Sequence, residues 1–208
     1  NEWKNYRWKS LMPAKESQTL VNSVGEFPIG IKKFVLKADP TELKKELQAQ
    51  INKIKSLGIK PTHIDSHEGA LFFNKEHFRV YLEVGEENKL PVFVPRGVDA
   101  HFGKGFSKPK NVVVIKDLYM ARKGLKKTKW KEFYLNTIRG LKPGISQLIV
   151  HLSYDDNEMK EISIDHPDYG AKWRHLDYEA VTNISFKKAL KQNDIKLVTW
   201  KEIQKVLY

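Results

Sequence analysis

Amphipathic helices alternate with short segments that favour an extended backbone, and this alternation constrains the fold more than any other feature of the sequence. A helix is predicted over 39–58, because aliphatic residues recur there every three and four positions with lysines between them. A second helix is predicted over 74–88. The stretches 61–67 and 90–95 follow these helices and contain residues typical of strands. Strand, helix and strand in this order form a βαβ unit, so we predict an α/β fold.

The same alternation continues toward the C-terminus. Further strands are predicted at 111–115, 146–152 and 195–200, and further helices from Thr128, near Asp177, over 185–193 and at the C-terminus.

Three helices begin at residues that can cap them. Asp39, Asn74 and Thr199 have side chains that accept hydrogen bonds from free backbone amides, and Glu42 and Glu202 would complete capping boxes with the first and last of these. Residues 1–31 contain scattered Pro and Gly, which predicts an irregular loop before the first helix. No repeat or linker interrupts the pattern, so we predict a single domain.

Composition excludes several classes of protein. The 208 residues include no cysteine, which excludes disulfides, thiolate metal sites and a cysteine nucleophile but leaves the cellular compartment open. No run approaches the roughly 18 apolar residues of a membrane span. A net charge of +12 is typical of proteins that bind nucleic acid. Most of this charge, however, comes from lysines scattered over helical surfaces, and only residues 122–127 form a concentrated run of positive charge. We therefore predict neither a nucleic-acid nor a membrane partner.

The stretch 61–69 carries the strongest functional signal. On a strand, His63, Asp65 and His67 would point to the same side, and the strand would end in a loop at Gly69. Imidazole and carboxylate are usual ligands of a catalytic cation, and the carboxyl end of a barrel strand is where such ligands lie. The alternative is a solvated turn in which the histidines cap backbone groups. His63 fits a buried hydrogen bond better than a metal.

Other polar residues lie at the ends of predicted strands. His151 and then Asp155 and Asp156 end the strand at 146–152, and the two aspartates are also suited to capping the next helix. Arg96 follows the strand at 90–95 and is a candidate for binding substrate, with a surface ion pair as the alternative. His101, His166 and His175 have no ligand spacing.

Four segments, in order, resemble the YdjC-like carbohydrate deacetylases, which are metal-dependent enzymes that remove N-acetyl groups from chitooligosaccharides. They are Glu2-Trp3-Lys4-Asn5-Tyr6-Arg7-Trp8 with Val21–Phe27, Lys60–His67, Pro143-Gly144 with Val150–Asp156, and Asp165-His166-Pro167-Asp168 with Trp173-Arg174. Together they span almost the whole chain, and the element T-H-x-D-S-H is specific.

The resemblance implies a distorted, TIM-like (β/α) barrel and a divalent cation, Mg²⁺ or Zn²⁺. It implies that His67 is a metal ligand and that His151 is the acid that protonates the departing amine. Asp65 would orient His67 or lie near the metal. The substrate would be an acetylated amino sugar or oligosaccharide. Glu68 stands where many relatives carry histidine, which leaves the exact sugar open.

The sequence departs from the family in one respect. The family's A-D-D-F-G and G-x-H-L-T-L-T elements, which supply the catalytic aspartate and two metal ligands, are not in this chain. We therefore expect a barrel without its first strands, weak metal binding and little or no deacetylase activity in the 208 residues alone. Unpaired sheet edges would favour self-association into a homo-oligomer.

Aromatic residues near the N-terminus leave a second class of function open. Trp3, Tyr6 and Trp8 can stack on sugar rings or pack the loop onto the core. If these aromatic side chains stack on sugar rings, Trp3 and Tyr6 are substrate-binding candidates, as Arg96 is. A carbohydrate-binding protein without catalysis would use the same aromatic residues.

Overall fold

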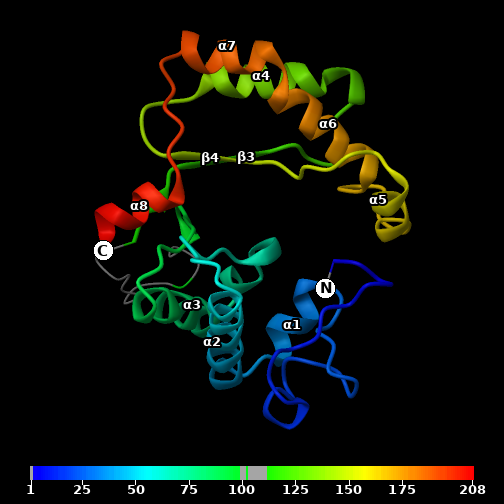
Figure 1. Cartoon of the computed structure of the whole chain (residues 1–208), viewed down its shortest axis with the longest axis vertical. Coiled ribbons are helices and arrows are strands. Elements are labelled where there is room, and N and C mark those ends of the chain that lie inside the picture. Colours follow the sequence, from blue (N-terminus) through cyan, green and yellow to red (C-terminus); the bar gives the residue numbers. More distant parts are fainter. Residues whose placement is uncertain (1, 99–101, 103–111) are drawn as a thin grey trace. The chain divides into compact units, whose positions relative to one another are not determined.

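The computed structural model describes residues 2–98, 102 and 112–208, and the chain divides into two compact units. One unit comprises Asn1–Val114 with Val198–Tyr208, and the other comprises Ile115–Leu197. Figure 1 shows their elements. None of the helices in the described ranges has the length and hydrophobicity needed to span a membrane.

The first unit is mainly helical. Its elements are the 3₁₀ helices η1 (Ala14–Glu16) and η2 (His67–Phe72), the helices α1 (Ile31–Lys37), α2 (Pro40–Ser56), α3 (Lys75–Glu87) and α8 (Trp200–Leu207), and the strand β1 (Val94–Pro95). The helices α2 and α3 pack on each other, and α3 supplies Phe78, Tyr81, Leu82 and Val84 to the core, as its periodicity predicts. The helix α1 was not predicted.

Local capping signals predicted the starts of α2 and α3 correctly but gave one wrong detail. Asp39 accepts hydrogen bonds from the amides of Thr41 and Glu42, and Asn74 caps α3 in the same way. Glu42, however, does not complete a capping box. Its carboxylate accepts hydrogen bonds from the backbone and hydroxyl of Thr19, at 2.8 and 2.7 Å, and so ties the N-terminal loop to α2.

A buried carboxylate also holds the N-terminal loop. Glu46 on α2 is almost fully buried, and its oxygens accept hydrogen bonds from the Ser10 hydroxyl at 2.5 Å and from the amide of Leu11 at 3.1 Å. The loop predicted over 1–31 is therefore irregular in backbone but fixed in place by polar contacts.

The strand predicted at 61–67 is reduced to one bridge. Ile64 pairs in parallel with Val92, and the tyrosine hydroxyl of Tyr81 donates a hydrogen bond to the Ile64 carbonyl at 2.8 Å. His67 begins η2 instead of continuing a strand, and Glu68 adopts a positive φ of 53°. The alternation expected of His63, Asp65 and His67 is thus broken.

The C-terminal helix α8 belongs to the first unit. The capping box of Thr199 and Glu202 is present as predicted. The Trp200 ring stacks on the ring of His63, with centroids 4.7 Å apart, and Gln204 donates a hydrogen bond to the Lys89 carbonyl. The strand predicted at 195–200 does not form.

The contact between His63 and Trp200 predicts a pH-dependent stability. Burial lowers the pKa of His63 below its ordinary value, so the fold favours the neutral ring. The His63 ring binds a proton more readily in the unfolded chain than in the folded chain. The free energy of unfolding should therefore fall as the pH decreases from 7.5 to 5.0. We expect urea midpoints at these two pH values to differ less in His63→Phe, which keeps the stacked ring, than in the unchanged chain. Equal differences would contradict this prediction.

The second unit is built on two parallel strands covered by helices. Its elements are β3 (Asp117–Met120), η4 (Lys127–Lys129), α4 (Trp130–Gly140), β4 (Ser146–Ile149), α5 (Asn157–Ile162), α6 (Ala171–Thr182) and α7 (Ile184–Gln192). Figure 1 shows α4, α6 and α7 along one side of β3 and β4. In the register, Asp117 pairs with Ser146 and Met120 pairs with Ile149. The sequence predicted β4 but not β3.

The described strands form two small open sheets. β1 pairs with β2 (Val114–Ile115), the strand at which the first unit ends, and β3 pairs with β4. The α/β class is confirmed, since parallel strands are joined through helices. A closed barrel is not observed among the described residues.

Candidate functional site

A buried carboxylate organises the polar groups of the second unit. Asp177 on α6 has only 1% of its side chain exposed. Its Oδ1 accepts hydrogen bonds from the indole of Trp130 at 2.7 Å and from the hydroxyl of Tyr134 at 2.5 Å. Both donors come from α4, so Asp177 joins the two helices and has its charge stabilised inside the unit.

The second oxygen of this carboxylate faces His151. Asp177 Oδ2 accepts a hydrogen bond from the His151 amide at 2.9 Å and lies 3.9 Å from the ring atom Nδ1. The histidine side chain is 28% exposed, and its ring meets Tyr169 edge-on at 5.1 Å. A partly exposed imidazole backed by a buried carboxylate is an arrangement that can transfer a proton to or from a bound molecule.

The sheet places this histidine where ligands of α/β proteins bind. β4 ends at Ile149, two residues before His151, and β3 ends at Met120, two residues before Arg122. Because β3 and β4 are parallel and Met120 pairs with Ile149, both side chains follow the carboxyl ends of neighbouring strands.

Two tyrosines near Asp177 have a pKa above the ordinary value. Burial, followed by the contact with Asp177, raises the pKa of Tyr134 far above its ordinary value. Burial is also the main cause that raises the pKa of Tyr169, with a further contribution from Asp168, whereas the charge of Arg122 lowers it. Tyr134 therefore keeps its proton and its hydrogen bond to Asp177 over the physiological range.

The first unit contains a separate pair of polar groups around His67. The side chain of His67 is 67% exposed, and its Nε2 lies 3.8 Å from Glu2 Oε2. Asp65 accepts a hydrogen bond from the Ser66 amide. The residue as a whole is exposed, but protein atoms crowd its carboxyl and raise the pKa of Asp65, while nearby His67 acts in the opposite direction. Its predicted role in orienting His67 stays a prediction.

The donors near His67 do not complete a metal site. Glu2 and His67 supply one carboxylate and one imidazole, whereas a catalytic cation is commonly held by about three protein ligands. Within residues 2–98, 102 and 112–208, no group of three or more His, Asp or Glu side chains is arranged to hold a metal ion. The ring of His63 stacks on the ring of Trp200.

The remaining candidates have varied environments. Trp3 is buried, whereas Tyr6 and Trp8 are exposed. Arg96 is exposed directly after β1. Roles for Trp3, Tyr6 and Arg96 in binding substrate stay predictions. His101 lies outside the described residues.

Other polar residues have structural roles. Asp156 caps α5 through the Met159 amide, and Asp155 pairs with Lys160. These contacts confirm the capping alternative for Asp156. The ring of His166 bonds the Asp168 carbonyl, and His175 faces Glu179 one turn along α6.

Comparison with known proteins assigns the family. The sequence model of the family described as "YdjC-like protein" matches residues 3–192. The chain belongs to the YdjC-like family. The resemblance carried by the motifs is thereby confirmed.

Two curated relatives of this YdjC-like chain carry the name carbohydrate deacetylase. The relative from Thermus thermophilus is 27% identical over 217 aligned residues, which cover 100% of this chain and 76% of the relative. The relative from Thermoanaerobacter pseudethanolicus is 27% identical and covers 92% of this chain and 72% of the relative. At the level of the family, these matches support a hydrolase of the deacetylase kind.

A solved structure supports the α/β fold of this family member. A crystal structure described as that of a cellobiose-phosphate cleavage protein from Enterococcus faecalis V583 superposes with a TM-score of 0.74 and 21% identity. The match covers 94% of this chain and 72% of that chain. At this identity, the likeness concerns the fold alone.

Proposed function

We propose that this YdjC-like protein is a metal-dependent hydrolase that removes N-acetyl groups from an amino sugar or oligosaccharide. The family and the names of its relatives support a carbohydrate deacetylase. The observation that carries the proposal in this chain is the pairing of His151 with the buried carboxylate of Asp177 at a strand end.

Hydrolysis of an N-acetyl group needs a proton donor, because a free amide anion is a very poor leaving group. In our proposal, His151 gives its proton to the departing amine nitrogen. Asp177 is a positioning residue: it holds the backbone at His151 through the amide contact, and its carboxylate stabilises the charged imidazolium before the proton is given away. Trp130 and Tyr134 hold Asp177 in place from α4.

The proposal includes a divalent cation, Mg²⁺ or Zn²⁺, with His67 and Glu2 as two of its ligands. Because these are only two donors, we expect the 208-residue chain to bind either cation weakly, with a dissociation constant above about 10 µM. Isothermal titration of the chain and of His67→Ala with Zn²⁺ or Mg²⁺ measures this. One-to-one binding at micromolar or lower concentrations, lost in His67→Ala, would contradict the expectation.

Release of acetate from N,N′-diacetylchitobiose tests the proposed activity. Millimolar Zn²⁺ or Mg²⁺ compensates for weak affinity, so we expect slow release that stops when a chelator is added. His67→Ala should be slower at each metal concentration. Release that persists in excess chelator would contradict a metal-dependent deacetylase.

The exposed Tyr6 and Trp8 support one alternative, a carbohydrate-binding protein without catalysis. This alternative predicts that the chain binds chitooligosaccharides without metal. Binding would survive His67→Ala and would weaken in Trp8→Ala. Titration of the three proteins with an acetylated chitooligosaccharide in the presence of chelator separates the two functions.

A further inference from the structure

A pocket beside β3 combines apolar walls with a cationic rim. It has a volume of about 350 Å³, which is at the lower end of the range of small-molecule sites. Its lining residues all belong to the second unit and are Leu118, Tyr119, Met120, Arg122, Lys123, Leu125 and Phe133.

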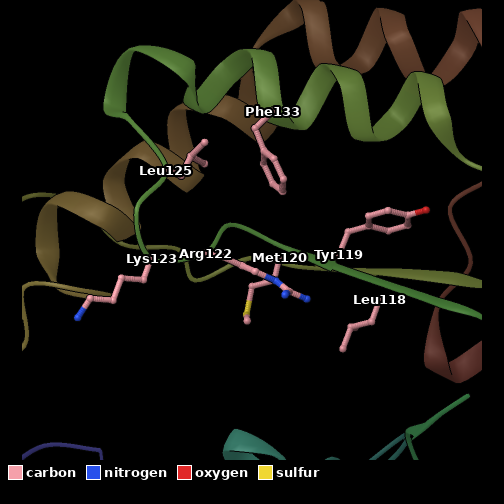
Figure 2. Close-up of a pocket in the computed structure, with 7 residues that line it drawn as sticks. All are labelled: Leu118, Tyr119, Met120, Arg122, Lys123, Leu125 and Phe133. Carbon is pink, nitrogen blue, oxygen red and sulfur yellow. The ribbon is translucent and has the colours of Figure 1, made fainter. Parts of the chain in front are cut away.

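The walls come from a strand, a turn and a helix. Figure 2 shows Phe133 pointing from α4 toward β3, with Leu125 beside it. Leu118 and Met120 project from β3 on the side away from Phe133, whereas Tyr119 lies on the Phe133 side, and Leu118 is 39% exposed. Leu118 and Met120 lie on the same side of the strand as the Arg122 side chain, and an apolar group of a ligand would gain free energy there by excluding water.

The charge at the rim is carried by Arg122. Lys123 also lines the pocket, but its ammonium lies 2.9 Å from a carboxylate oxygen of Asp168, which offsets its charge. Across the described part of the chain, no ion pair of Arg122 with a carboxylate is found, and its side chain is exposed. Arg122 and Met120 both line the pocket, so the pocket combines a positive charge with an apolar wall.

We propose that this pocket binds a small organic anion that combines an apolar ring or chain with a phosphate or carboxylate group. Arg122 pairs with the anion through two parallel N–H donors, a geometry that suits both phosphate and carboxylate. The apolar part of the ligand packs against Leu118 and Met120. The inference does not rest on the proposed deacetylase activity, because neither His151 nor Asp177 lines the pocket.

Titration calorimetry with phenyl phosphate and with benzoate tests the proposal on the whole 208-residue chain. We expect saturable binding of at least one of them with a dissociation constant below about 1 mM. Inorganic phosphate, which lacks the apolar part, and benzyl alcohol, which lacks the charge, should each bind at least about tenfold more weakly. The tighter of the two aryl anions identifies the preferred charged group.

Variants assign the binding to this pocket. Arg122→Gln should weaken it at least about tenfold, and Leu118→Glu should do the same by placing a negative charge at the rim. Arg139→Gln is the matched control, because Arg139 is an exposed arginine on α4 outside the pocket. His151→Gln should bind as the unchanged chain does. Thermal melting shows that each variant is folded.

Three results would overturn the proposal. The first is the absence of saturable binding of both aryl anions up to 10 mM, on the order of the weakest specific affinities. The second is binding by Arg122→Gln within about threefold of the unchanged chain. The third is equal affinity for inorganic phosphate and phenyl phosphate, which would show that the apolar walls contribute nothing.

Discussion

Replacement of Asp177 by alanine is expected to lower the free energy of unfolding by about 3–5 kcal/mol. The substitution removes one carboxylate that accepts hydrogen bonds from Trp130, Tyr134 and the His151 amide. All three donors would lose their partner in or near the core, and each unsatisfied buried donor costs about 1–3 kcal/mol. Urea denaturation followed by tryptophan fluorescence measures the change.

Asp155→Ala is the control for this experiment. Asp155 is exposed and pairs with Lys160 at 3.5 Å, a surface contact worth at most about 1 kcal/mol. A loss in Asp177→Ala no larger than the loss in Asp155→Ala would show that Asp177 does not hold α4 and α6 together.

His151→Gln is expected to reduce acetate release from N,N′-diacetylchitobiose by about 10²–10⁴-fold, the usual contribution of a general acid. Glutamine keeps the backbone amide that bonds Asp177 and can fill a similar space, so the fold should be retained. Initial rates at millimolar metal measure this effect.

His166→Gln is the matched control for His151→Gln, because the His166 ring bonds a backbone carbonyl in the same unit and has no role in our proposal. Its rates should stay within about threefold of the unchanged chain, on the order of a neutral surface substitution. Equal rates in His151→Gln and His166→Gln would remove His151 from the reaction.

Signals confined to a few neighbouring residues predicted local structure well. Asp39, Asn74 and Thr199 cap the helices that they precede, because each side chain reaches an amide only two or three residues away. Glu42 has the right spacing for a capping box but bonds Thr19, which is distant in sequence. A local rule cannot foresee a partner brought in by the tertiary fold.

The strands were harder to predict than the helices. The short strand β3 lies in a stretch between lysines and was not predicted, whereas its partner β4 was predicted from a more apolar run. The segment 195–200 has a strand-like composition, but α8 begins at Trp200, whose ring is used in the stack with His63. Without β3, the pocket beside it could not be anticipated.

The sequence predicted only one of the two central residues of the candidate site. His151 was predicted because it follows an apolar strand, but Asp177 lies 26 residues later on a helix. One signal could have identified it: Trp173, Asp177 and Ala180 recur at helical spacing, which places a carboxylate on the buried face of α6. A charge on such a face needs partners, and a search for them would have led to Trp130 and Tyr134.

The catalytic rate of Asp177→Asn tests most directly whether a carboxylate behind His151 makes it a proton donor. Asparagine keeps Oδ1 as the acceptor for Trp130 and Tyr134 but replaces the charged oxygen that faces the imidazole. We predict that kcat for acetate release falls by about 100-fold or more while KM stays within about threefold and the variant remains folded. An unchanged kcat in folded Asp177→Asn would contradict the account.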